Sequence, residues 1–145
     1  MFLFLNQYTH SLDDKGRLTI PAAYRAAFKD GLVITRAQKP HLIIFTLEGW
    51  EELAQRFKGK PVFTHERLAN LRRLVFSNAV RTTLDNHGRV RIPEHLLAHA
   101  QIKDRAVLAG AGDHVEVWSP PLWQQKQEEL NTIPISDEQE DMLRI

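Results

Sequence analysis

The chain has 145 residues, of which 43% are apolar and 26% are charged, with a formal net charge of +1 and no cysteine. This composition is typical of a soluble globular protein rather than a disordered one, and it excludes disulfides, thiolate metal sites and a cysteine nucleophile. The charge is uneven: residues 1–76 hold twelve Lys and Arg against seven Asp and Glu, and residues 77–145 hold seven against eleven. This asymmetry fits either a polyanion-binding face with an acidic tail or a solvated surface of uneven charge.

The opening segment, MFLFL, is apolar but too short to span a bilayer. No basic region precedes it, and aspartates follow at positions 13 and 14. We therefore expect neither a signal peptide nor a membrane anchor, and we predict a cytoplasmic protein.

One motif occurs twice: residues 12–21 read LDDKGRLTIP and residues 84–93 read LDNHGRVRIP. In each copy Asp-x-x-Gly predicts a turn, with the glycine in a backbone conformation that costs other residues more. The alternation that follows predicts a strand with one apolar face and one polar face. The proline that ends each copy, Pro21 or Pro93, suits the first turn of a helix.

The similarity extends beyond this motif. A short helical pattern follows at 22–28 and at 94–100, then two runs rich in Val, Ile and Leu around a turn, and then tryptophan. Two copies of this length indicate an internal duplication with pseudo-twofold symmetry, because a solenoid needs at least about three repeats. We assign residues 1–76 to a first repeat with a helical connector, and residues 77–145 to a second repeat with a C-terminal helical tail.

Helical patterns also connect the halves and occupy the tail. Segments 48–57 and 64–80 each place apolar residues three and four positions apart, and Thr64 is the expected N-cap of the second. In the tail, Ser119 precedes a proline that begins a further helix. Ser136 stands three residues before a glutamine, which is capping-box spacing ahead of a short last helix.

The residues that form the two turns have a structural interpretation. Asp13 and Asp85 are expected to cap backbone N–H groups, and Gly16 and Gly88 are expected to supply the turn conformation. In the same interpretation each following arginine pairs with a nearby carboxylate. We favour this account for the aspartates and the glycines, but not for the arginines.

The arginines of the two turns have a functional interpretation. Arg17 and Arg89 lie on the polar faces of matched turns, and an arginine fork binds phosphate or the O6 and N7 edge of guanine. Surface ion pairs contribute little stability, so stability alone explains the duplication poorly. We add Arg91 and Lys15 as DNA-contacting cations, together with His87, which stands in the second turn where the first has lysine and is largely neutral at pH 7.

Other candidate sites are weaker. His95 and His99 are four residues apart, but no glutamate or third ligand accompanies them, so we expect a packed or exposed helix and no metal. The sequence has no serine elbow and no phosphate-binding loop, so we expect no enzyme, no cofactor and no small-molecule substrate. We interpret Arg67, Arg72 and Arg73 as a solvated face, in preference to a second phosphate patch or a rim of subunit contacts.

With these motifs the chain closely resembles the MraZ family of bacterial transcriptional regulators, which is related to the AbrB and SpoVT swapped-hairpin DNA-binding proteins. The resemblance rests on HSLDDKGRLTIPAAYR, RRLVFSNA, LDNHGRVRIPEHL and GAGDHVEVW. It implies an α+β, β-rich fold, in which two tandem AbrB/SpoVT-like repeats form one pseudo-twofold swapped-hairpin β-barrel with short flanking helices. Asn6 stands where the family commonly has glycine, and asparagine tolerates a left-handed backbone better than most residues.

The resemblance also implies a function. The chain would be a sequence-specific, nucleoid-associated regulator, a repressor of the division and cell-wall gene cluster, and would bind direct repeats in its own promoter. It would assemble into closed homo-oligomeric rings and contact double-stranded DNA through Arg17 and Arg89, with Lys15 beside the first; His87 and Arg91 complete our predicted DNA-binding set. The alternative is a ring-forming scaffold protein that does not read DNA, which the near-neutral charge and the acidic tail suggest.

Overall fold

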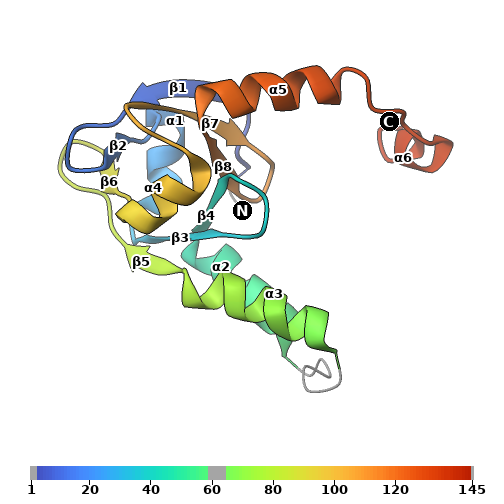
Figure 1. Cartoon of the computed structure of the whole chain (residues 1–145), viewed down its shortest axis with the longest axis horizontal. Helices are drawn as coiled ribbons and strands as arrows, with labels where there is room; N and C mark the ends of the chain where they lie inside the picture. The colour runs from blue at the N-terminus through green and yellow to red at the C-terminus, as the bar shows by residue number, and fades with distance from the viewer. Residues whose placement is uncertain (1–2, 59–64, 145) are drawn as a thin grey trace.

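The structure, a computed structural model, describes residues 3–58 and 65–144. Figure 1 shows strands through the middle of the molecule, with helices on several sides of them. In chain order the elements are β1 (Gln7–Ser11), β2 (Arg17–Thr19), α1 (Ala22–Arg25), the 3-10 turn η1 (Ala26–Phe28), β3 (Leu32–Arg36), β4 (Leu42–Thr46), α2 (Leu47–Phe57), α3 (Glu66–Ser77), β5 (Val80–Thr82), β6 (Arg89–Arg91), α4 (Glu94–Ala100), β7 (Arg105–Gly110), β8 (Val115–Trp118), α5 (Pro120–Leu130) and α6 (Asp137–Asp141).

Six strands form one antiparallel sheet in the order β1-β7-β8-β4-β3-β5. The first strand of the first half, β1, pairs with β7 of the second half, and β5 of the second half pairs with β3 of the first. Strands β4 and β8 pair at the centre. The two halves therefore exchange strands, and the order reads the same from either end when β1 to β4 are matched with β5 to β8.

The hydrophobic core takes side chains from both halves. Leu18 and Ile20 after the first turn, and Val90 and Ile92 after the second, are at most 2% exposed and belong to one cluster. The alternation in each motif explains this, because every second residue of a strand faces the same side. Burying one such side chain stabilises the fold by about 1.5–3 kcal/mol. Because the side chains of both halves form a single cluster, each half depends on the other for this burial.

The N-terminal segment is fixed onto this core by aromatic packing and by backbone contacts. The Phe4 ring lies 5.2 Å from the rings of both Tyr24 and Phe28, between centroids. The Tyr24 hydroxyl donates to the carbonyl oxygens of Leu5 and Asn6, at 2.5 and 3.0 Å. Asn6 itself has a φ of 65°, a left-handed backbone that asparagine tolerates better than most residues.

The helices between the halves follow the predicted pattern with one correction. Helix α2 begins after Thr46, whose hydroxyl accepts a hydrogen bond from a backbone N–H of the first turn. Helix α3 ends at Ser77, so the prediction of a helix through residue 80 was wrong at its end. Val80 instead pairs with Ile34 in strand β5, because the chain rejoins the sheet there. The predicted cap Thr64 lies outside the described residues.

The tail begins on the sheet and then leaves it. Ser119 caps α5, whose Trp123 Nε1 donates to Gln7 Oε1 of β1 at 2.8 Å. The predicted capping box at Ser136 is confirmed, and it opens α6. In Figure 1, α6 lies at the right, well away from the sheet. Five large apolar side chains of this tail are exposed, at Leu130, Ile133, Ile135, Met142 and Leu143.

The fold is α+β and strand-rich, as the sequence predicts. The closed barrel that the resemblance implies stays a prediction. Among the described residues, no helix has both the length and the apolar character needed to cross a membrane.

Candidate nucleic-acid interface

The first of the two turns is closed by Asp13. Its carbonyl oxygen accepts a hydrogen bond from Gly16 N at 3.1 Å. Its side-chain Oδ1 accepts from Lys15 N at 3.0 Å and from Arg17 N at 2.9 Å. An aspartate that bonds the backbone two residues on is the usual way for this side chain to hold a turn. The loop that carries Lys15 and Arg17 is therefore fixed by its own aspartate.

The second turn is built in the same way around Asp85. The Asp85 carbonyl oxygen accepts from Gly88 N at 3.0 Å, and its Oδ1 accepts from His87 N and Arg89 N, both at 2.9 Å. The two glycines have φ values of 76° and 72°, a region that side chains with a Cβ rarely adopt. The repeated sequence therefore produces two turns with the same backbone geometry.

The strands that follow the turns join them into one unit. Strands β2 and β6 form a two-stranded antiparallel sheet, which we call the ribbon (residues 17–19 and 89–91). Beyond the ribbon, Ile20 N donates to Gly88 O at 2.9 Å, and Ile92 N donates to Gly16 O at 2.8 Å. Each turn is thus hydrogen-bonded to the strand end of the opposite half, which joins the two turns through the backbone.

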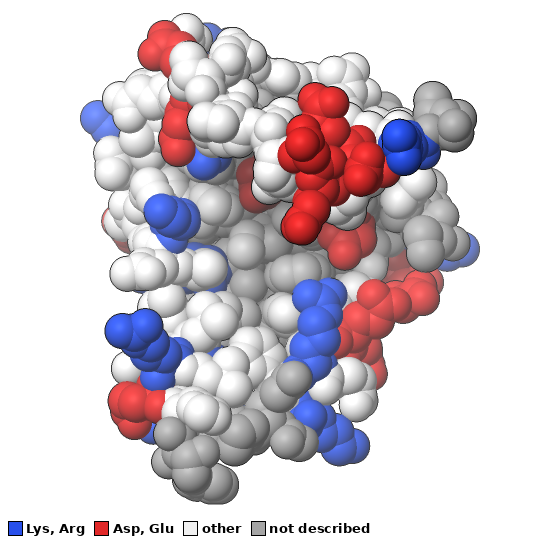
Figure 2. Space-filling view, turned by 90° about the vertical axis from the view of Figure 1, so that its right-hand side faces the viewer, with Lys and Arg blue, Asp and Glu red and all other residues white. Residues whose placement is uncertain are grey.

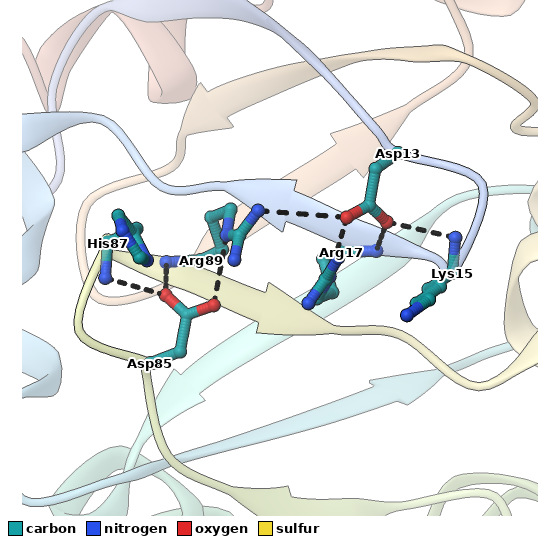
Figure 3. Close-up of polar contacts among 6 residues, drawn as sticks. All are labelled: Asp13, Lys15, Arg17, Asp85, His87 and Arg89. Atoms are coloured by element: carbon teal, nitrogen blue, oxygen red, sulfur yellow. Dashed lines mark hydrogen bonds and ion pairs between the residues drawn. The ribbon is translucent and has the colours of Figure 1, made fainter.

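The register of the ribbon brings the sequence-predicted residues together. Arg17 lies opposite Arg91, and Thr19 lies opposite Arg89. The alternate residues, Leu18 and Val90, are completely buried, so the arginines occupy the other face of the ribbon. Figure 3 shows Lys15 and His87 at the two outer ends, with Arg17 and Arg89 between them.

Both turn arginines make ion pairs with the aspartates. Arg17 Nε lies 2.5 Å from Asp13 Oδ2, and Arg89 Nε lies 2.9 Å from Asp85 Oδ2. Arg89 Nη1 also lies 3.7 Å from Asp13 Oδ2, which links the two turns (Figure 3). The pairing with a nearby carboxylate, the structural alternative in the sequence, is therefore present at both positions.

These ion pairs orient the arginines without enclosing them. The Arg17 and Arg89 side chains remain 35% and 27% exposed. A guanidinium has five N–H donors in a fixed fork, and the bond through Nε leaves the four on Nη1 and Nη2. For Arg17, neither Nη has a hydrogen-bond partner among residues 3–58 and 65–144. The fork is held at one edge, and its other edge is open to a ligand.

The same contacts change the acidity of the aspartates. Backbone hydrogen bonds from Arg17 and Arg89, with smaller contributions from their side chains, lower the pKa values of Asp13 and Asp85 below the usual 3.8. Both carboxylates are therefore ionised near neutral pH, where they hold the turns and the arginines.

We expect these carboxylates to make the fold sensitive to acid. A pKa that is lower in the folded chain than in the unfolded chain gives stability that is present above the usual pKa and is lost as the pH falls through the folded one. In the double variant Asp13→Asn/Asp85→Asn, urea midpoints between about pH 5 and pH 2.5 should fall less steeply than in the parent. The matched control is Asp137→Asn/Asp141→Asn on the exposed helix α6. A parent-like slope in the turn variant would contradict this expectation.

A hollow of about 640 Å³ lies beside the first turn, between that turn and helix α4. Its lining mixes both signs of charge, with Lys15, Arg91 and Lys103 as cations and Asp14 and Glu94 among the anions. Lys103 was not among the sequence-predicted residues, because it follows α4 and no motif marks it. Its position beside the first turn comes only from the fold.

Other charged groups lie away from the ribbon. Arg67, Arg72 and Arg73 are exposed on α3, and Arg73 pairs with Glu66 at 3.2 Å. The acidic side chains of α6 are exposed as well, and Figure 2 shows an acidic patch on the side of the molecule where the C-terminal segment lies. In Figure 1 the ribbon is at the opposite end from α6. The acidic tail therefore does not cover the candidate interface within one chain.

A family model described as "MraZ protein, putative antitoxin-like" matches this chain twice, over residues 3–73 and 75–145. The chain belongs to the MraZ family. The two matches also confirm the internal duplication that the sequence indicates, since each half aligns with the same MraZ unit.

Curated MraZ relatives agree over most of the chain. The protein named "Transcriptional regulator MraZ" from Roseiflexus sp. (strain RS-1) is 43% identical over 122 residues, which cover 84% of this chain and 85% of the relative. The relatives of the same name from Roseiflexus castenholzii and Herpetosiphon aurantiacus are 44% and 41% identical, with the same coverage.

The described parts of the chain do not assemble a metal site. Across residues 3–58 and 65–144, no group of three or more His, Cys, Asp or Glu side chains is arranged to hold a metal ion. His99 instead has its Nε2 2.7 Å from the Lys39 carbonyl oxygen.

Proposed function

We propose that the chain is a sequence-specific DNA-binding transcriptional regulator that reads duplex DNA with the two turns and the ribbon. The relatives in its family carry the name transcriptional regulator, which supports a role in regulation and gives no reason to propose an enzyme. The observation that carries the proposal is the ribbon itself. It presents two partly exposed arginines on one face, from turns of matched backbone geometry, and the major groove of B-DNA admits a two-stranded β-ribbon.

Each candidate residue then has a role. Arg17 and Arg89, held through Nε, would direct Nη groups at the O6 and N7 edge of guanine. Lys15, His87 and Arg91 would lie against the sugar–phosphate backbone, which fixes position without reading sequence. Because the aspartates offset much of the arginine charge, we expect only a weak general attraction to phosphate. Specific binding would then depend on how the guanidinium donors are oriented toward the bases, more than on the net positive charge of the ribbon.

The resemblance to the AbrB and SpoVT proteins supports a larger assembly. The two repeats, 1–76 and 77–145, would form one swapped-hairpin barrel, and copies of it would assemble into a closed homo-oligomeric ring. The protein would act in the cytoplasm on nucleoid DNA, as a repressor of the division and cell-wall gene cluster. Binding of one copy would place the next at high effective concentration over the adjacent direct repeat in its promoter.

A binding titration tests the proposal. We expect the DNA upstream of the chain's own gene to bind about 10³-fold or more tightly than a scrambled fragment of the same length. For both fragments log K should fall linearly with log salt between about 50 and 200 mM, by about 0.9 for each phosphate neutralised. Equal affinity for the two fragments, measured by fluorescence anisotropy, would refute sequence-specific binding.

A ring-forming scaffold without DNA reading is the second candidate. The tail is the observation that favours it, because it exposes five large apolar side chains for which DNA reading gives no use. Pull-downs with and without nuclease distinguish the two functions. Partners that are lost after nuclease treatment would count against the scaffold.

A further inference from the structure

The two turns differ in the side chain that packs against their glycines. Residues 72 positions apart correspond between the halves, so Arg25 at the end of α1 corresponds to Leu97 in α4. A Cβ placed on Gly88 would lie 2.4 Å from Arg25 Nε and 2.7 Å from its Cζ. A Cβ placed on Gly16 would lie 3.4 Å from a terminal methyl of Leu97. The same place is therefore filled by a guanidinium at the second turn and by an apolar group at the first.

The Arg25 guanidinium is fixed at one edge. Its Nε donates to the Ile20 carbonyl oxygen at 2.8 Å, and Ile20 N in turn donates to Gly88 O. Within residues 3–58 and 65–144, neither Nη of Arg25 has a hydrogen-bond partner, and the side chain is partly exposed. A positive group from the first half is thus held against the second turn with donors to spare.

The residue two positions after the aspartate also differs between the turns, and here the positive charge is on the first turn. The first turn has Lys15 where the second has His87, and histidine carries much less positive charge than lysine near neutral pH. In the first turn, Leu97 packs against the glycine and the loop has Lys15. In the second turn, Arg25 packs against the glycine and the loop has His87. The cation missing from the loop of the second turn is present in the helix beneath it.

We propose that Arg25 is a phosphate-contacting residue of the DNA interface, which supplies to the second turn the cation that Lys15 supplies to the first. This inference rests on the proposed function. Packing alone does not require a guanidinium here, because Leu97 fills the equivalent place without a charge. Arginine also suits the task, since its fork keeps Nη donors for phosphate while Nε holds the backbone.

The test compares Arg25→Leu, which copies the residue of the first half, with the wild-type chain. At about 100 mM salt we expect roughly tenfold weaker binding to the DNA upstream of the chain's own gene, the loss typical of one charged hydrogen bond. A scrambled fragment should lose the same factor, because phosphate contacts carry no sequence information. The slope of log K against log salt should become shallower by about 0.9. Lys15→Leu should do the same.

Two further variants separate charge from packing. Arg25→Lys keeps the charge and should retain the wild-type salt slope. Arg25→Gln keeps a donor for the Ile20 carbonyl oxygen but removes the charge, and its salt slope should be shallower, as in Arg25→Leu. The matched control is Arg56→Leu, an exposed arginine in the last turn of α2 that should leave the slope unchanged.

The outcomes are distinguishable. A folded Arg25→Leu with the wild-type slope would overturn the inference and leave Arg25 a packing residue. If that variant does not fold, equal slopes for Arg25→Lys and Arg25→Gln would overturn it instead. Failure of the wild-type chain to bind either DNA fragment would overturn the proposed function itself, and this inference with it.

Discussion

The double variant Arg17→Ala/Arg89→Ala is expected to lose specific DNA binding while it keeps its fold. Each lost arginine contact to guanine should cost about 1–3 kcal/mol. Specific binding exceeds non-specific binding by only about 4–10 kcal/mol, so two such losses remove much of the difference. Anisotropy titrations with the upstream fragment and with the scrambled fragment give this difference directly.

The stability of the same variant should change little. The two arginines make partly exposed ion pairs, and such pairs contribute about 0–1 kcal/mol each. The hydrogen bonds of both turns are made by backbone N–H groups and by the aspartates, which the substitutions leave in place. The control, Arg56→Ala/Arg144→Ala, removes the same charge far from the ribbon. If it weakened specific binding as much as the turn variant, net charge rather than the turns would explain the binding.

The second large effect concerns the two halves expressed as separate chains, 1–76 and 77–145. Neither should show a cooperative thermal transition by circular dichroism, because β1 lacks β7 in the first half and β5 lacks β3 in the second. The expected loss is the whole stability of a small domain, about 5–15 kcal/mol. An equimolar mixture should recover a transition whose midpoint rises with concentration, since the partner strands are then supplied by another molecule.

A cooperative transition in either half alone would contradict this expectation. It would mean that the half is an independent domain, although the buried side chains of both halves form one cluster. Chains of this length are marginal alone even when their sheet is complete.

Local chemistry made part of this structure predictable. The turns around Gly16 and Gly88 and the cap at Ser136 each depend on neighbouring residues. The ribbon strands were also predictable, because their alternation is clear over a few positions. The repeat spacing indicated that the two turns belong to equivalent halves, and the sequence alone thus located the candidate site.

Long-range pairing was not predictable in the same way. A strand that pairs within its own half has the same local pattern as one that pairs across halves, so the exchange of β1 and β5 left no signal. Strand β1 has the sequence QYTHS, which shows no alternation of apolar and polar residues, and none of its residues is fully buried. The short strand β5 follows a helical pattern that continues into it, which explains the wrong helix end.

The site itself shows the same limit. The sequence analysis favoured a functional account of Arg17 and Arg89 over pairing with a carboxylate, and the structure has the ion pairs at both positions. The sequence offered no reason to associate Arg25 with Gly88, since a helix of one half meets the turn of the other only after the strands are exchanged. Comparing the two halves position by position would have found the difference between Arg25 and Leu97, though not its location.

Because the two strand-exchanged halves are parts of one polypeptide, they can differ in sequence, and this affects how the protein could be oriented on DNA. A symmetric dimer of identical chains presents the same surface twice and therefore reads palindromic sites. Here the two turns have diverged. The first has Lys15 in its loop and Leu97 packed against its glycine, and the second has His87 and Arg25 in the corresponding places. If the turns bind DNA as proposed, the protein would have a direction on the duplex, and neighbouring copies would be free to bind head to tail along it.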